Sequence, residues 1–332
     1  MIMSRRAKYI ILNVVFCSLF LVSCRESKVE KIQGVTLNKG AIIALNNGNY
    51  ENYDLQEGKY SKIESEEIIR IYDEDSGNYV LQKEDQYQYF YDGIINNLND
   101  IGSNVSNLKL SPKGRYVSYF SNNEGLGLHL INLDNNSPIE FESNVLISGT
   151  FLDWLDEENI VYYGISNDGV NGIFQYNVKD KVEKLFYKLE GGYIHFIKNV
   201  ESGVVCIQET IDNKKIVRLL SKDGNEKEVL SGELNNAYDV VYDGSKYYFL
   251  GKSTNNITSI YKLENNKLKR MVYDFPKTIN EKKGLSIDDE GNILFVGANS
   301  SDNKEQIYKI QNDGAVSVVE SNSVDYDFVK YQ

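Results

Sequence analysis

Residues 105–120 read Val105-Ser106-Asn107-Leu108-Lys109-Leu110-Ser111-Pro112-Lys113-Gly114-Arg115-Tyr116-Val117-Ser118-Tyr119-Phe120. Two short apolar segments stand on either side of a turn at Lys113-Gly114. Because β-branched and aromatic residues favour strands and Gly favours a tight turn, this stretch predicts a pair of strands. Two further segments with the same character follow at residues 128–133 and 138–141, so the region predicts four strands in a row.

The four-strand pattern returns along the chain. Further copies occupy residues 149–188, 193–231, 237–275 and 283–320, and a degenerate copy occupies residues 67–98. The glycine of the first turn marks the period, because Gly77 and Gly291 lie 214 residues apart over five intervals. That spacing is about 43 residues per unit, and four-stranded repeats of this length are typical of β-propeller blades.

The two ends of the chain supply one more blade. Residues 41–64 contain three strand-like segments and residues 324–331 contain one, which would be the innermost strand of the same blade. Pairing of the two ends would close the ring and leave no open sheet edge. Seven units of about 43 residues fit residues 41–332 best. We therefore predict an all-β, seven-bladed β-propeller, with six or eight blades as the alternatives.

Two motifs resemble known propeller families. The run Leu110-Ser111-Pro112-Lys113-Gly114-Arg115-Tyr116-Val117-Ser118-Tyr119 resembles the repeat of TolB-like and WD-repeat-like propellers, and residues 284–296 are similar to an NHL-type repeat. The sequence departs from the WD-repeat pattern because it has no Trp-Asp dipeptide and no Gly-His pair. The resemblance implies a fold and transfers no function.

The first residues have the order of a secretory signal. Arg5, Arg6 and Lys8 precede an apolar run over residues 9–21, which is too short to span a bilayer as a helix. The next residues, Leu21-Val22-Ser23-Cys24, resemble the lipobox of bacterial lipoproteins. The resemblance implies cleavage between Ser23 and Cys24 and lipidation of Cys24; the alternative is an ordinary cleaved signal.

These observations predict three regions: a lipoprotein signal peptide at residues 1–23, a lipidated Cys24 with a flexible tether to residue 40, and a propeller at residues 41–332. The predicted location is the cell membrane, lipid-anchored on its extracytoplasmic side. The whole chain has a formal net charge of −12, and removal of residues 1–23 would change it to −15. Such a charge repels a phosphate backbone, so we expect no nucleic-acid partner.

Several residues on predicted inner strands are candidates for a binding face: Arg70, Phe151, Trp154, Tyr193, His195 and Tyr238. Aromatic side chains there could stack on a peptide or a sugar at the mouth of the ring. The alternative is that they pack between neighbouring blades. In a propeller, one face gathers the longer loops, and we expect the binding surface on that loop-rich face.

No catalytic motif stands out in the sequence. The two histidines, His129 and His195, fall in different blades, no Gly-x-Ser-x-Gly motif occurs, and Cys206 stands in an apolar strand typical of a core. We expect no metal and no cofactor. The sequence favours a binding or scaffold module at the cell envelope, with the membrane as partner through the Cys24 lipid and a protein, peptide or glycan on the loop-rich face. The alternative is a hydrolase or lyase acting on glycans or peptides in the central funnel.

Overall fold

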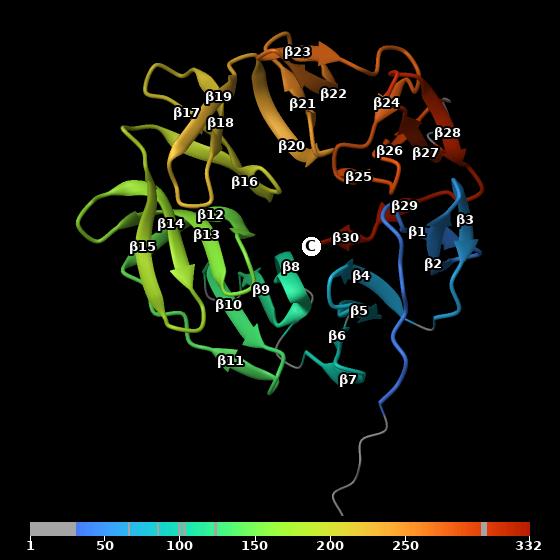
Figure 1. Ribbon diagram of the computed structural model, residues 1–332, viewed down its shortest axis with the longest axis horizontal. Coiled ribbons are helices and arrows are strands. Elements are labelled where there is room, and N and C mark those ends of the chain that lie inside the picture. The colour runs from blue at the N-terminus through green and yellow to red at the C-terminus, as the bar shows by residue number, and fades with distance from the viewer. Residues whose placement is uncertain are drawn as a thin grey trace, which may run out of the picture. The chain divides into compact units, whose positions relative to one another are not determined.

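Seven small sheets follow one another around a central axis in residues 34–332 (Figure 1). The computed structural model describes residues 31–332 except 66, 85, 99–100, 102–103, 123–124 and 300–303. The predicted all-β, seven-bladed propeller is confirmed, and the alternatives with six or eight blades are wrong. The signal peptide, Ser23 and Cys24 lie outside the described residues, so the anchor stays a prediction.

Four blades consist of four consecutive strands each, numbered from the centre outward. Blade 3 contains β8 (Val105–Leu110), β9 (Tyr116–Ser121), β10 (Gly127–Asn132) and β11 (Ser137–Ile139), with a 3-10 turn at Pro112–Gly114. Blade 4 contains β12 (Val145–Trp154), β13 (Asn159–Ser166), β14 (Asn171–Asn177) and β15 (Val182–Lys188). Blade 5 contains β16 (Tyr193–Val200), β17 (Gly203–Glu209), β18 (Lys215–Leu220) and β19 (Glu226–Ser231). Blade 6 contains β20 (Leu234–Tyr242), β21 (Tyr247–Ser253), β22 (Thr258–Glu264) and β23 (Lys267–Arg270).

The other three blades depart from this pattern. Blade 7 has a split inner strand, β24 (Thr278–Ile279) and β25 (Leu285–Ile287), followed by β26 (Ile293–Ala298), β27 (Glu305–Ile310) and β28 (Val316–Glu320). Blade 1 contains β29 (Tyr326–Phe328), β1 (Ile42–Asn46), β2 (Asn49–Gln56) and β3 (Lys59–Lys62). Blade 2 contains β30 (Lys330–Tyr331), β4 (Ile68–Tyr72), β5 (Tyr79–Lys83), β6 (Gln86–Tyr91) and β7 (Ile94–Asn97).

The two ends of the domain close the ring. Strand β29 pairs antiparallel with β1, with Phe328 opposite Ile42 and Tyr326 opposite Ala44. The predicted closure is therefore confirmed. The backbone N–H of Leu45 extends the pairing by donating to the carbonyl of Asp325 at 3.0 Å.

The C-terminal segment contributes a strand to each of two blades, whereas the sequence predicted one strand in one blade. Residues 324–331 were expected to be one strand, but the chain leaves blade 1 after Phe328, and β30 pairs in parallel with β4 of blade 2. The backbone N–H of Val329 donates to the carbonyl of Ala41 at 3.0 Å at the crossing. The C-terminal segment therefore joins two blades, and Figure 1 places β30 near the centre of the ring.

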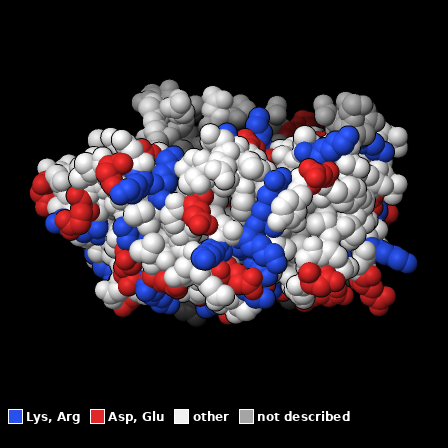
Figure 2. Space-filling model, turned by 90° about the horizontal axis from the view of Figure 1, so that it is seen from above, with Lys and Arg blue, Asp and Glu red and all other residues white. Residues whose placement is uncertain are grey.

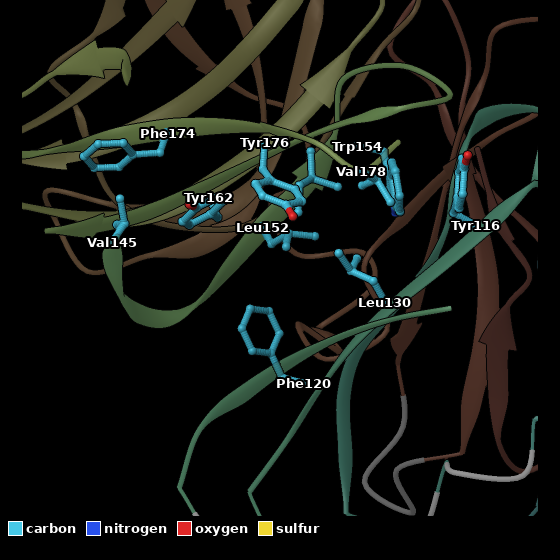
Figure 3. Close-up of a cluster of buried hydrophobic side chains, with 11 residues drawn as sticks. Tyr116, Phe120, Leu130, Val145, Leu152, Trp154, Tyr162, Phe174, Tyr176 and Val178 are labelled. Atoms are coloured by element: carbon cyan, nitrogen blue, oxygen red, sulfur yellow. The ribbon is translucent and has the colours of Figure 1, made fainter. Parts of the chain in front are cut away.

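The hydrophobic core lies between neighbouring blades. One cluster joins Tyr116 and Phe120 of blade 3 to Trp154, Tyr162 and other side chains of blade 4 (Figure 3). The Tyr116 and Trp154 rings stack with centroids 6.0 Å apart. The second strands β9, β17 and β26 are buried on both faces against adjacent sheets, so they carry near-continuous apolar runs. Cys206 is fully buried in such a strand, and burial raises the pKa of its thiol to about 12.

The inner turn of blade 3 needs its glycine. Gly114 has φ of +66°, and a Cβ atom there would lie 2.5 Å from Cβ of Asn78 in blade 2. The buried carboxylate of Asp73 accepts a hydrogen bond from the backbone N–H of Lys113 at 2.9 Å. The tight turns of neighbouring blades are therefore interlocked.

The domain begins earlier than residue 41. Leu37 is buried with side chains of blade 2, and the Asn38 side chain donates to Asp54 at 2.9 Å, so the end of the expected tether packs on the propeller. Lys39 forms an ion pair of 3.1 Å with Glu74, which lies in a tight turn between the first two main strands of blade 2. Among the described residues, no helix has the length and apolar character needed to cross a membrane.

Candidate functional site

The antiparallel order of the strands gives the propeller two unlike faces. The turns between first and second strands, and between third and fourth, lie on what we call the tight-turn face. The hairpins between second and third strands lie on the opposite, loop-rich face, together with the links from one blade to the next. Residues 34–40 lie on the tight-turn face, because Lys39 and Asn38 contact residues near those turns.

Exposed apolar side chains concentrate on the loop-rich face. In the described part of residues 34–332, fifteen large apolar side chains are exposed, and ten of them lie in its hairpins, in its blade links or at the strand ends beside them. We call these ten the apolar rim: Tyr50, Leu126, Leu146, Ile165, Tyr193, Ile211, Ile257, Tyr273, Phe275 and Val324. Val182 alone of the fifteen lies at a tight turn, and the remaining four lie on outer strands.

Tyr193 and His195 lie together on this face, at the start of β16. The Tyr193 side chain is 61% exposed, and its ring meets the His195 ring edge to face with centroids 6.5 Å apart. Nε2 of His195 lies 2.8 Å from Oε2 of Glu209, and Lys215 lies 3.5 Å from the same oxygen. This group combines an exposed aromatic ring with a charged hydrogen-bonding cluster.

The other four candidates lie elsewhere. Trp154 is buried between blades 3 and 4, where its Nε1–H donates to Oγ of Ser118 at 3.0 Å. Phe151 and Tyr238 are half-buried and line the central cavity described below. Arg70 donates to Gln82 at 2.7 Å and pairs with Asp327 at 3.4 Å. The structure therefore does not bring the six predicted residues into one site.

A cavity of about 580 Å³ lies on the axis of the ring. It is lined by the inner strands β8, β12, β16, β20 and β25 and by the C-terminal segment Phe328–Gln332. Six lysines and two carboxylates belong to its lining. This basic lining contrasts with the formal net charge of −12 and with the interspersed acidic and basic side chains on the side of the molecule in Figure 2.

Ion pairs tie the inner strands together across blade boundaries. Lys109 of blade 3 lies 2.6 Å from Asp153 of blade 4, and Lys198 of blade 5 lies 2.5 Å from Asp239 of blade 6. Asp153 also accepts the backbone N–H of Asn199 in blade 5 at 2.8 Å.

The same arrangement continues around the ring. Asp239 accepts the N–H of Leu285 in blade 7 at 2.9 Å. Lys283 of blade 7 lies 2.9 Å from Asp325 at the start of the inner strand of blade 1. These carboxylates hold neighbouring blades together at the level of the cavity wall.

Asp325, which pairs with Lys283, also accepts a hydrogen bond of 2.6 Å from the hydroxyl of Tyr50. Burial by itself would raise the pKa of Asp325, but the hydrogen bonds from Lys283 and Tyr50 outweigh it and lower the pKa. Desolvation raises the pKa of Tyr238, and its hydrogen bond to the carboxylate of Glu281 acts in the same direction. The carboxylate of Asp325 is therefore held in its charged, hydrogen-bonded state.

A second hollow lies between blades 3 and 4. This groove of about 710 Å³ is lined largely by apolar side chains of β10, β11 and the start of β12, and includes the rim residues Leu126 and Leu146. His129 stands in it, 2.7 Å from Oγ of Ser121 and stacked on Tyr119 with centroids 4.8 Å apart. Among the described residues, no group of three or more His, Cys, Asp or Glu side chains is placed to hold a metal ion.

The sequence contains one pattern that indicates the cavity, and its residues are not among the six predicted site residues. Three inner strands carry a charged residue next to apolar residues, as in Leu108-Lys109-Leu110, Leu152-Asp153-Trp154 and Phe196-Ile197-Lys198. Their signs alternate from blade to blade, with separations close to the repeat length.

Comparison with known proteins defines the class. No protein-family model and no curated protein sequence matches the chain. Dipeptidyl peptidase 4 of Porphyromonas gingivalis is similar in structure, with a TM-score of 0.52 at 13% identity over 92% of this chain; the match spans 55% of the peptidase, about half its length. Oligogalacturonate lyase of Vibrio parahaemolyticus has a TM-score of 0.55 at 11% identity, over 89% of this chain and 87% of the lyase.

TolB of Acinetobacter baumannii gives a TM-score of 0.48 at 10% identity, over 90% of this chain and 81% of TolB. At identities this low, the matches to the peptidase and the lyase establish the fold alone. The chain is a β-propeller, as its sheet order already requires, and its resemblance to propeller repeats is confirmed at the level of the fold.

Proposed function

We propose that this protein is an extracytoplasmic, lipid-anchored binding module that holds a protein, peptide or glycan on the loop-rich face of its propeller. The observation that carries the proposal is the apolar rim, with ten of the fifteen exposed large apolar side chains of the described domain on one face. Single exposed apolar residues are ordinary, but their concentration on one face is typical of an interaction surface.

The chemistry of the rim suits a peptide or a sugar. Tyr50, Tyr193, Tyr273 and Phe275 offer aromatic faces, and Tyr193 and Tyr273 also carry a hydroxyl that can hydrogen-bond to a ligand. Aromatic side chains give large contact area at little cost in conformational entropy, which is why they dominate binding surfaces. They stand on loops and strand ends that a rigid ring holds in place.

The course of the chain bears on which face a lipid anchor would hold. The domain begins at Gly34, and residues 34–40 pack on the tight-turn face. A lipid on Cys24 would therefore hold the domain by that face and leave the loop-rich face free for a partner. Two or three acyl chains would make such an anchor stable.

The test of the binding site uses the rim and a matched surface. Purified protein carrying Tyr193→Ser and Ile211→Ser is compared with a Val182→Ser control on peptide and glycan arrays. The proposal predicts that ligands bound by the wild type are lost by the rim variant and kept by the control. Equal binding by all three proteins, or loss only in the control, contradicts it.

The anchor is tested separately. The Cys24→Ala variant should leave the membrane fraction and take up no labelled lipid. If it remains membrane-bound and labelled, the lipid-anchor proposal is wrong, whatever the array result.

A glycan or peptide hydrolase or lyase is the second candidate, supported by the contact of 2.8 Å between His195 and Glu209. This pair lies on the loop-rich face beside the exposed ring of Tyr193. Histidine beside a carboxylate can act in general acid–base chemistry. Turnover of an array ligand that is abolished by His195→Ala would favour the enzyme, whereas binding without turnover favours the binding module.

A further inference from the structure

The lysines of the central cavity follow a pairing rule. Lys109, Lys198 and Lys283 each have a carboxylate partner about one repeat further along the chain, at separations of 44, 41 and 42 residues. Basic blades 3, 5 and 7 therefore alternate with acidic blades 4, 6 and 1. Each pair neutralises its own lysine, so these three lysines leave little free positive charge in the cavity.

Seven blades cannot complete this alternation, because seven is an odd number. Blade 2 follows acidic blade 1 and carries Arg70, whose guanidinium group lies 3.4 Å from the carboxylate of Asp327 in blade 1. The next blade, blade 3, is basic again through Lys109. Two basic blades therefore stand side by side, and the alternating pattern breaks between blade 2 and blade 3.

The C-terminal strand adds another cation at this break. Lys330 lies in β30, paired with β4 of blade 2, and its side chain is exposed to the cavity. In the part of the chain that the structure describes, no carboxylate lies within ion-pair distance of its ammonium group. Lys330 is thus a cation on the ring axis without a carboxylate of its own.

The surroundings of Lys330 disfavour its charge. The cavity walls around the ammonium group desolvate it, and the positive charge of Lys109 acts in the same direction, so its pKa is lowered. Asp327 and Asp239 oppose the shift but do not cancel it. A bound anion would relieve this unfavourable balance, because an opposite charge nearby stabilises the ammonium form.

We propose that the central cavity binds a small multivalent oxyanion, a polycarboxylate or a phosphate compound, with Lys330 at the centre of the site. A volume of about 580 Å³ is large enough for such a ligand and lies in the range of small-molecule pockets. Lys282, a further lysine of the lining, is exposed near the loop-rich side and would meet the ligand on entry. This site is separate from the apolar rim and does not depend on it.

The experiment uses citrate and pyrophosphate as probes, each titrated into the protein by calorimetry at constant ionic strength set with sodium chloride. Wild type is compared with Lys330→Gln and with Lys222→Gln, which removes an exposed lysine in a tight turn of blade 5. Melting of the unliganded proteins is recorded in parallel. Because Lys330 has no ion pair to lose, Lys330→Gln should melt no lower than the wild type.

The wild type and Lys222→Gln should bind at least one probe with a dissociation constant below about 1 mM, and Lys330→Gln should bind it at least about tenfold more weakly. Binding of citrate alone assigns the carboxylate class, and binding of pyrophosphate alone assigns the phosphate class. The proposal is overturned if neither probe binds the wild type, or if folded Lys330→Gln binds as tightly as the wild type.

Discussion

Replacing Asp153 by alanine should weaken the propeller at two blade boundaries at once. Its carboxylate, 6% exposed, accepts Lys109 of blade 3 at 2.6 Å and the backbone N–H of Asn199 of blade 5 at 2.8 Å. The substitution leaves a lysine that is 18% exposed without a partner and a backbone N–H unsatisfied. Breaking one partner of a buried pair costs about 3–5 kcal/mol.

For a domain of about 300 residues, a loss of about 3 kcal/mol lowers the melting temperature by roughly 5 °C. Differential scanning calorimetry measures the shift. Glu142→Ala is the matched control, because it removes the nearer of the two carboxylate partners of Lys181, and the side chains of Glu142 and Lys181 are both exposed. An exposed pair contributes about 1 kcal/mol or less, so the control should change the melting temperature by about 2 °C or less.

A second substitution isolates the unpaired charge. Adding Lys109→Met to Asp153→Ala removes the ammonium group that the single variant leaves unpaired, so the double variant should recover part of the lost stability. The reasoning fails if Asp153→Ala lowers the melting temperature no more than Glu142→Ala does. It also fails if the loss of stability in the double variant equals the sum of the losses in Asp153→Ala and Lys109→Met, because the pair then does not stabilise the inner strands.

Three further predictions concern stability and reactivity. Gly114→Ala should lower the free energy of unfolding by about 2 kcal/mol more than Gly48→Ala, as measured by chemical denaturation. Both glycines have positive φ, but a Cβ at Gly48 would meet nothing within 4 Å, whereas a Cβ at Gly114 would meet Asn78 of blade 2. Equal losses would show that the contact with blade 2 relaxes freely. The pKa of Asp325 is lowered from 3.8 in the folded protein, so its charged form stabilises the fold above pH 3.8, and this stabilisation is lost as the pH falls through the lowered pKa. Asp325→Asn should therefore destabilise the protein at pH 7 and have the same stability as the wild type in acid. A constant difference in stability down to pH 2 argues against this. Cys206, buried with its pKa raised to about 12, should resist alkylation in the native protein and react after unfolding, as mass spectrometry would show; rapid native labelling would mean that its strand opens.

The blades were predictable from the sequence because they are local. A strand-turn-strand unit such as residues 105–120 depends on residues close in the chain, and its glycine has the positive φ that the turn signal predicts. Repetition of the unit every 43 residues or so then gave the number of blades. Even the closure of the ring could be predicted, because an incomplete blade at one end required a strand from the other.

The candidate site was only partly predictable. Tyr193 and Trp154 were both candidates for the binding face, but Tyr193 is exposed whereas Trp154 is buried between blades. The two environments cannot be told apart along the chain, because aromatic residues suit both a core and a binding surface. Which side of an inner strand meets a neighbouring blade depends on the bulges in those strands, such as the register shift between Ile147 and Leu152.

The sequence by itself determined the strands, their turns and the number of blades, since all of these follow from short-range periodicity repeated many times. Tertiary structure alone decided which charges meet at the axis and that the chain's last strand joins blade 2 instead of remaining in blade 1. The physical reason is that radial packing brings together side chains more than forty residues apart, as with Lys109 and Asp153. Their energies depend on desolvation and distance inside the closed ring, and neither quantity exists until the ring has formed.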